Sequence, residues 1–194
     1  MTPPRTTKAA AGTLSVLPWV YPLDEFYARA GLPLPRIDVL AGDKIPEPYR
    51  SLLLHTNDMT PTLEAFHGSE MHLQILRSEP RGDFYFREVV LRLNSNDRPV
   101  EFGANKISLN LYSPPVRQLI LQERVPLGHI LKEHQVPHQT RAKAFLRLES
   151  DAFISQALGL DHPCVLYGRR ATIWDPHQRP LSEIVEILPP VEPH

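Results

Sequence analysis

The sequence has only one cysteine, Cys164, which excludes an intramolecular disulfide. The residues that follow it, Val165, Leu166 and Tyr167, offer neither a base nor a cation that would generate a thiolate. Cys164 is therefore expected to be a small buried hydrophobe in a strand, and a reducing cytoplasm is the default compartment.

The sequence also lacks an excess of either charge and lacks long apolar runs. The chain carries 21 Lys and Arg against 22 Asp and Glu, without the basic cluster that a phosphate backbone requires. No apolar run is long enough to span a bilayer. Residues 5–22 imitate a signal peptide only loosely, because Pro18 interrupts them and no clear cleavage pattern follows. We expect no nucleic-acid partner and no membrane partner, and we expect the first residues to form a loose extension.

Common motifs for catalysis and cofactor binding are missing as well. The sequence lacks a Gly-rich phosphate loop, a Gly-x-Ser-x-Gly elbow and a His-Glu-x-x-His zinc helix. The nearest metal-like pattern is His134 with His138, but Pro137 breaks the helix that would place both imidazoles on one face. We therefore expect neither a metal nor an organic cofactor.

Proline, by contrast, is abundant. The chain has 21 prolines, which are densest in the first 48 positions and in the last six. Proline supplies no hydrogen-bond donor to a sheet, so residues 1–48 are expected to form an irregular arm containing one short helix, at 23–31. Residues 49–190 are expected to form a single domain, which is long enough to bury a sizeable core.

Hydrophobic periodicity divides the rest of the chain into strands and helices. A period of two predicts six strands, with helices that begin at Pro48, Thr60, Ser113-Pro114 and Pro126 and after Ser150. The helices are grouped and do not alternate regularly with the strands, which favours an antiparallel α+β domain. The predicted strands are residues 71–77, 83–94, 100–109, 142–149, 163–174 and 181–188.

Arg87 lies in the predicted strand 83–94 and has apolar neighbours on its own face. Strand side chains alternate between faces, so Tyr85, Val89 and Leu91 share the side of Arg87. Glu88 points to the opposite face and is expected to be a solvated or rim position. A guanidinium that faces an apolar interior costs several kcal/mol unless an anion meets it.

Glu186 is a second charged residue on an apolar strand face, which it shares with Ile184 and Leu188. Glu186 and Arg87 could simply pair, as buried charges usually do. They could instead flank a small anionic ligand, with Arg87 clamping a carboxylate and Glu186 accepting from a hydroxyl. Arg169 and Arg170 point to opposite faces of another strand, and the sequence leaves open which of them is inside.

Short motifs follow one another in a specific order along the chain. They are Leu52-Leu53-Leu54 with Met59-Thr60, Tyr85-x-Arg87-Glu88, Pro126-Leu127-Gly128, Gly168-Arg169-Arg170, and Glu186 near the C-terminus. In order and spacing these motifs resemble the chorismate pyruvate-lyase (4-hydroxybenzoate synthase) family and its chorismate-lyase-like relatives. The likeness covers about residues 48–190.

The resemblance implies a six-stranded antiparallel sheet with a helical flap over a buried ligand cavity. The implied activity is elimination of pyruvate from chorismate to give 4-hydroxybenzoate, without a cofactor, for quinone biosynthesis or a secondary metabolite. Arg87 would hold the ring carboxylate, and Glu186 would bind the ring hydroxyl and polarise it or handle a proton. The Leu127 backbone amide would contact the ligand, Met59 would line the pocket, and Arg169 belongs to the same substrate-binding set.

The sequence departs from the family pattern at one position. Where the lyase often has Gly-Arg in the third strand, this chain has Gly103-Ala104, so a cation for the second carboxylate of chorismate is missing. Lys106 shares the face of Ala104 and could substitute for it, although lysine does not reproduce the bidentate grip of arginine.

Two further functions therefore stay open. One is a non-catalytic binder of small aromatic acids, because effector domains of transcription factors share a related fold. The other is a lyase with a different carboxylated substrate or hydroxybenzoate product. The proline-rich first 48 residues do not resemble a DNA-binding helical module. All three functions imply a small-molecule partner, and the sequence does not determine the oligomeric state.

Overall fold

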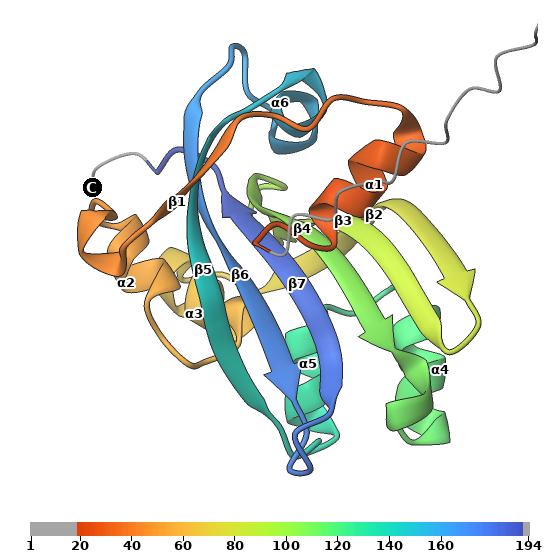
Figure 1. Ribbon diagram of the computed structural model, residues 1–194. Helices are drawn as coiled ribbons and strands as arrows, with labels where there is room; N and C mark the ends of the chain where they lie inside the picture. Colours follow the sequence, from red (N-terminus) through yellow and green to blue (C-terminus); the bar gives the residue numbers. More distant parts are fainter. Residues whose placement is uncertain (1–18, 192–194) are drawn as a thin grey trace, which may run out of the picture.

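The computed structural model describes residues 19–191, and its centre is a single antiparallel sheet (Figure 1). The sheet has seven strands in the order β1-β5-β6-β7-β4-β3-β2. The strands are β1 (Ile37–Leu40), β2 (Met71–Arg81), β3 (Phe84–Leu93), β4 (Pro99–Ser108), β5 (Gln139–Glu149), β6 (Val165–Trp174) and β7 (Pro180–Leu188).

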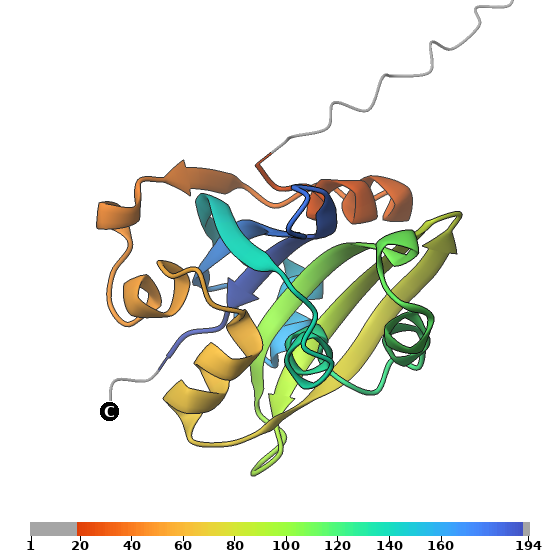
Figure 2. The same ribbon diagram turned by 90° about the horizontal axis from the view of Figure 1, so that it is seen from below.

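Helices cover both faces of the sheet. Figure 2 shows α1 on one side and α3, α4 and α5 on the other. The first face packs on α1 and α6, and the second packs on α2 to α5, so the protein has a core on each side of the sheet. The helices are α1 (Leu23–Ala30), α2 (Tyr49–Leu53), α3 (Met59–His67), α4 (Pro114–Leu121), α5 (Leu127–Glu133) and α6 (Ala152–Leu158), with short 3-10 turns at Gly42–Lys44 and Leu109–Leu111.

The predicted α+β class is confirmed, and all six predicted strands are present as β2 to β7. The seventh strand, β1, was not predicted, because Ile37–Leu40 is a four-residue segment in a proline-rich region. It pairs only with β5, at the edge of the sheet, where proline-flanked segments are tolerated.

The described part of the expected proline-rich arm, residues 19–48, packs against the sheet. The short helix expected at 23–31 is present as α1, and its side chains Leu23, Phe26 and Tyr27 are buried in the core of the first face. The Tyr27 hydroxyl donates to Asp151 at 2.7 Å. Residues 1–18, which include the stretch that imitates a signal peptide, lie outside the described part of the chain. No helix among residues 19–191 is long and apolar enough to cross a membrane.

Burial of both sheet faces also corrects the prediction for Glu88. This carboxylate is fully buried beneath α1 and α6, where it pairs with Arg77. It was expected to be solvated because its strand was interpreted as having one buried face.

Candidate ligand-binding site

A small cavity lies on the second face of the sheet, beneath α3 and α5, and its volume is about 50 Å³. Strand pairing brings its polar residues together: Arg87 pairs with Asn105, Gly103 with Glu186, and Glu186 with Arg169. Residues paired in this way point to the same face of a sheet. The cavity lining includes Asp58, Met59, Thr60, Arg87, Glu101, Asn105, Leu127, Gly128, Thr140 and Glu186.

Arg87 reaches this cavity from β3 with 1% of its surface exposed. Its Nε and Nη1 atoms have no hydrogen-bond partner within residues 19–191. Burial lowers the pKa of the guanidinium from its usual 12.5, but an arginine stays protonated at neutral pH. The protein therefore carries a buried positive charge that forms no ion pair with a carboxylate among the described residues, although the charge of Glu123 partly offsets it from a greater distance.

Glu186 does not pair with Arg87, and it does not stand free opposite it. Its Oε2 atom accepts a hydrogen bond of 2.5 Å from Nε of Arg169, which is fully buried. The rest of the Arg169 guanidinium donates to backbone carbonyls of Leu53, His55 and Asn57 at 3.2–3.4 Å. Arg169 therefore joins β6 and β7 to the loop between α2 and α3, and it does not itself line the cavity.

Gly168 allows this close packing of β6 on β7. A Cβ atom at this position would lie 2.3 Å from the carbonyl oxygen of Glu186 and 3.2 Å from Ile187, both part of the neighbouring strand. Any side chain would push the two strands apart. The glycine that precedes Arg169 is thus required to seat the Arg169–Glu186 pair.

Lys106 lies on the other face of the sheet, so the expectation that it helps to bind a ligand is corrected. It shares the face of Ala104, as predicted, but this is the face covered by α1. Its Nζ atom lies 3.3 Å from Glu183 and over the ring of Phe84. Arg170 is also on that face and pairs with Glu183 at 2.7 Å. Neither cation can compensate for an arginine missing from the cavity.

Met59 and Leu127 both line the cavity. Met59 opens α3 and Leu127 opens α5, and the two helices pack together over the sheet. Gly128 lets them approach, because a Cβ atom there would lie 2.9 Å from Oγ1 of Thr60. The α5 segment is thus a close-fitting lid over the cavity.

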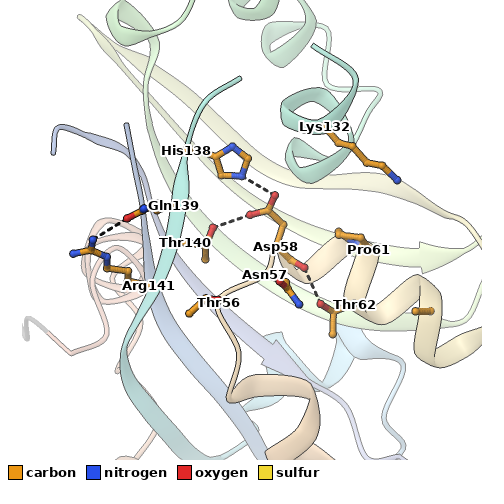
Figure 3. A pocket seen from close by; sticks show the side chains of 11 residues that line it. Thr56, Asn57, Asp58, Pro61, Thr62, Lys132, His138, Gln139, Thr140 and Arg141 are labelled. Atoms are coloured by element: carbon orange, nitrogen blue, oxygen red, sulfur yellow. Dashed lines mark hydrogen bonds and ion pairs between the residues drawn. The ribbon is translucent and has the colours of Figure 1, made fainter. Parts of the chain in front are cut away.

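An open groove of about 930 Å³ adjoins this lid, between α3, α5 and the start of β5 (Figure 3). Asp58 and Thr140 line both the groove and the cavity. The Asp58 carboxylate accepts hydrogen bonds from His138 at 2.9 Å and from Thr140 at 2.7 Å (Figure 3). This Asp58–His138–Thr140 cluster forms the wall between the groove and the cavity.

No protein-family model and no curated protein matches this chain. Solved structures do match. PhnF from Mycobacterium smegmatis superposes with a TM-score of 0.55 at 13% identity, over 70% of this chain and 65% of its own. A structure from Bordetella bronchiseptica, described as the ligand-binding domain of a GntR-family transcriptional regulator, superposes with a TM-score of 0.50 at 14% identity, over 64% of this chain and 88% of its own. The fold is chorismate-lyase-like. Identities this low show the fold alone.

Sequence reasoning missed several residues of the cavity in this chorismate-lyase-like fold. Glu101 and Asn105 share a face with Gly103, and both are buried in the site. Their alternation along β4 was a usable signal, but the sequence could not show which face of β4 meets Arg87. Asp58 and Thr140 come from segments far apart in the chain, and only the folded structure brings them together.

The Asp58–His138 contact predicts a pH dependence of stability. Both ring nitrogens of His138 face oxygen acceptors, the Val136 carbonyl at 2.6 Å and the Asp58 carboxylate, so only the imidazolium can donate to both. The hydrogen bond to Asp58 raises the pKa of His138. Burial opposes a low pKa for Asp58, but the hydrogen bonds from His138 and Thr140 outweigh it and lower that pKa.

Because the folded-state pKa of His138 is raised, its stabilising effect should be complete below about pH 6.5 and should disappear as the pH rises through the folded-state pKa. Urea unfolding at a series of pH values measures this loss. In His138→Gln the corresponding fall in the free energy of unfolding should be absent. The matched variant His177→Gln, in the turn between β6 and β7, should keep the wild-type profile, and a wild-type profile in His138→Gln would contradict the assignment.

Proposed function

We propose that this chain is a ligand-binding domain that holds a small organic anion on Arg87. The observation that supports this is the buried Arg87 guanidinium, which lines a cavity and whose Nε and Nη1 atoms have no hydrogen-bond partner in the described part of the chain. A buried cation of this kind is costly unless an anion completes it. The ligand-binding domain from Bordetella bronchiseptica with the same fold agrees with a role in binding an effector.

The size of the cavity indicates how a ligand enters. About 50 Å³ holds only a few water molecules. An anion with more than a few heavy atoms must therefore displace the lid formed by α5, whose contact with α3 depends on Gly128. Movement of a helix on ligand entry is also what an effector domain needs to report occupancy.

Thermal unfolding in the presence of small carboxylates and phosphate esters tests the proposal. A ligand that binds only the folded state at about 100 times its Kd adds about 2.7 kcal/mol to stability, which raises the Tm. We expect at least one anion to raise the Tm of the wild type and to have no effect on Arg87→Met. If no anion gives an Arg87-dependent shift, the proposed function is wrong.

Chorismate pyruvate-lyase activity is the second candidate. It is favoured because Met59, Arg87, Leu127 and Glu186, which come from four separate motifs, all line one cavity. The charges of the cavity argue against it. Chorismate has two carboxylates, and Ala104 and Lys106 lie on the opposite face, so Arg87 is the single lining cation without a partner among the described residues.

Incubating the protein with chorismate separates the candidates. Release of 4-hydroxybenzoate and pyruvate that depends on Arg87 would establish the lyase. A different aromatic acid would indicate a related lyase with another product. Unchanged chorismate, together with an Arg87-dependent Tm shift by another anion, is the result expected for a binding domain.

A further inference from the structure

Glu101 is a buried acid in the lining of the cavity. It points from β4 into the site, with 5% of its surface exposed, and its Oε2 atom has no hydrogen-bond partner within residues 19–191. It is separate from the pair that Glu186 makes with Arg169. An ionised carboxylate without a partner is expensive to bury, whereas a neutral carboxylic acid is not.

Among the groups that face Glu101, the nearby Glu186 carboxylate favours its neutral form. Glu186 on β7 is a carboxylate nearby, and its charge is only partly offset by Arg169 on β6. Burial and the neighbouring Glu186 raise the pKa of Glu101 well above its ordinary value, and Arg169 opposes this rise. Arg87 lines the same cavity from β3, and Asp58 lines it from the start of α3.

The spacing along β4 places Glu101 at the far end of the cavity from Arg87. Arg87 pairs with Asn105, and Glu101 lies four residues from Asn105, a separation of about 13 Å between backbone positions. Gly103 lies between them without a side chain. Oε1 of Glu101 and Nδ2 of Asn105 lie 3.2 and 3.3 Å from the position that a Gly103 Cβ atom would take, so the Glu101 side chain leans along the strand toward Asn105.

We propose that Glu101 acts as a neutral hydrogen-bonding acid that makes the cavity selective for monoanions over dianions of the same shape. The monoanion places its carboxylate on Arg87 and a neutral polar group on Glu101. This inference rests on the proposed function. It follows from the charges: Arg169 pairs with Glu186, Asp58 accepts hydrogen bonds from His138 and Thr140, and Arg87 is the lining cation without an ion-pair partner among residues 19–191.

Matched pairs of probes test the charge selectivity. Succinamate and succinate have the same shape, as do 4-carbamoylbenzoate and terephthalate, but the first of each pair is a monoanion and the second a dianion. We expect the monoanion to bind the wild type at least about 10-fold more tightly, because the second carboxylate of the dianion would be buried without a cation to pair with. Glu101→Gln, a neutral isostere, should keep this preference, and Glu101→Leu should bind the monoanion about 10-fold more weakly.

A pH series and an infrared spectrum test the charge of Glu101 itself. As Glu101 ionises at high pH, the wild type should lose affinity for the monoanion, whereas Glu101→Gln should not. At neutral pH the wild type should show the carbonyl band of a protonated carboxylic acid, and this band should be absent from Glu101→Gln.

The outcomes separate this inference from the proposed function. If a probe binds in an Arg87-dependent manner but dianions bind as tightly as monoanions, the inference fails and the proposed function stands. A carboxylate band for Glu101 at neutral pH also overturns the inference, with or without a ligand. If none of the probes and no anion of the wider panel binds in an Arg87-dependent manner, the proposed function and the selectivity both fail.

Discussion

Replacing Arg87 with methionine should raise the free energy of unfolding and abolish anion binding in the same variant. Methionine replaces the aliphatic part of the arginine side chain and carries no charge, so it removes the cost of burying a guanidinium whose Nε and Nη1 atoms lack partners within residues 19–191. The expected gain is about 1–3 kcal/mol, reduced by any water that reaches the cavity. Loss of a charge-assisted bidentate contact should weaken binding by about 100-fold or more.

Urea unfolding and ligand-induced Tm shifts measure the two effects. Arg92→Met is the matched control, because Arg92 lies on the same strand and makes its contacts with Gln74 and Asp97 at the surface. This control should bind anions like the wild type and should gain no stability. A marked loss of stability in Arg87→Met would show that Arg87 is a structural residue, and the proposed ligand site would lose its main support.

The fold could be predicted largely from local patterns. Alternation identified each strand from β2 to β7, and the positions of proline and glycine identified where the helices begin and end. β1 escaped because a four-residue edge strand lacks a periodic signal, and it forms only because β5 offers a free edge. The sequence also did not show that helices cover both faces of the sheet. Glu88 is buried on the face covered by α1, a helix distant in sequence.

The candidate site could be predicted only in part. The alternation of side chains along one strand was enough to place Arg87 on an apolar face, because this inference needs no information about neighbouring strands. The partner of Glu186 could not be inferred in this way. It depends on the register between β6 and β7, which sets Arg169 opposite Glu186 and leaves Arg87 two strands away.

The same limit applies to Glu101 and Lys106. Both lie on β4, but an odd number of positions separates them, so their side chains point to opposite faces of the sheet. Glu101 faces the cavity and Lys106 faces α1. Only the pairing of Arg87 with Asn105 decides which of them joins the site. The resemblance in short motifs identified residues that line the cavity, but it did not identify the lining acids Glu101 and Asp58.

Replacing Arg169 with methionine should have the opposite effect on stability from the same change at Arg87. Arg169 is equally buried and lies on the same face, but it is satisfied by Glu186 and by three backbone carbonyls. Its loss leaves the Glu186 carboxylate buried without its partner, which typically costs about 3–5 kcal/mol. The loop that leads to Asp58 and Met59 is released as well, so anion affinity should also fall. Urea unfolding measures the first effect and ligand-induced Tm shifts measure the second.

Two further variants identify the cause of that loss. In Arg170→Met, the neighbouring arginine is removed from a partly exposed pair with Glu183, and the cost should stay within about 1 kcal/mol. The double variant Arg169→Met with Glu186→Leu removes both charges, so it should be more stable than Arg169→Met alone. It should still be less stable than the wild type, because the carbonyls of Leu53, His55 and Asn57 lose their donor. Equal stability of the single and double variants would show that the Arg169–Glu186 pair is not what holds β6, β7 and this loop together.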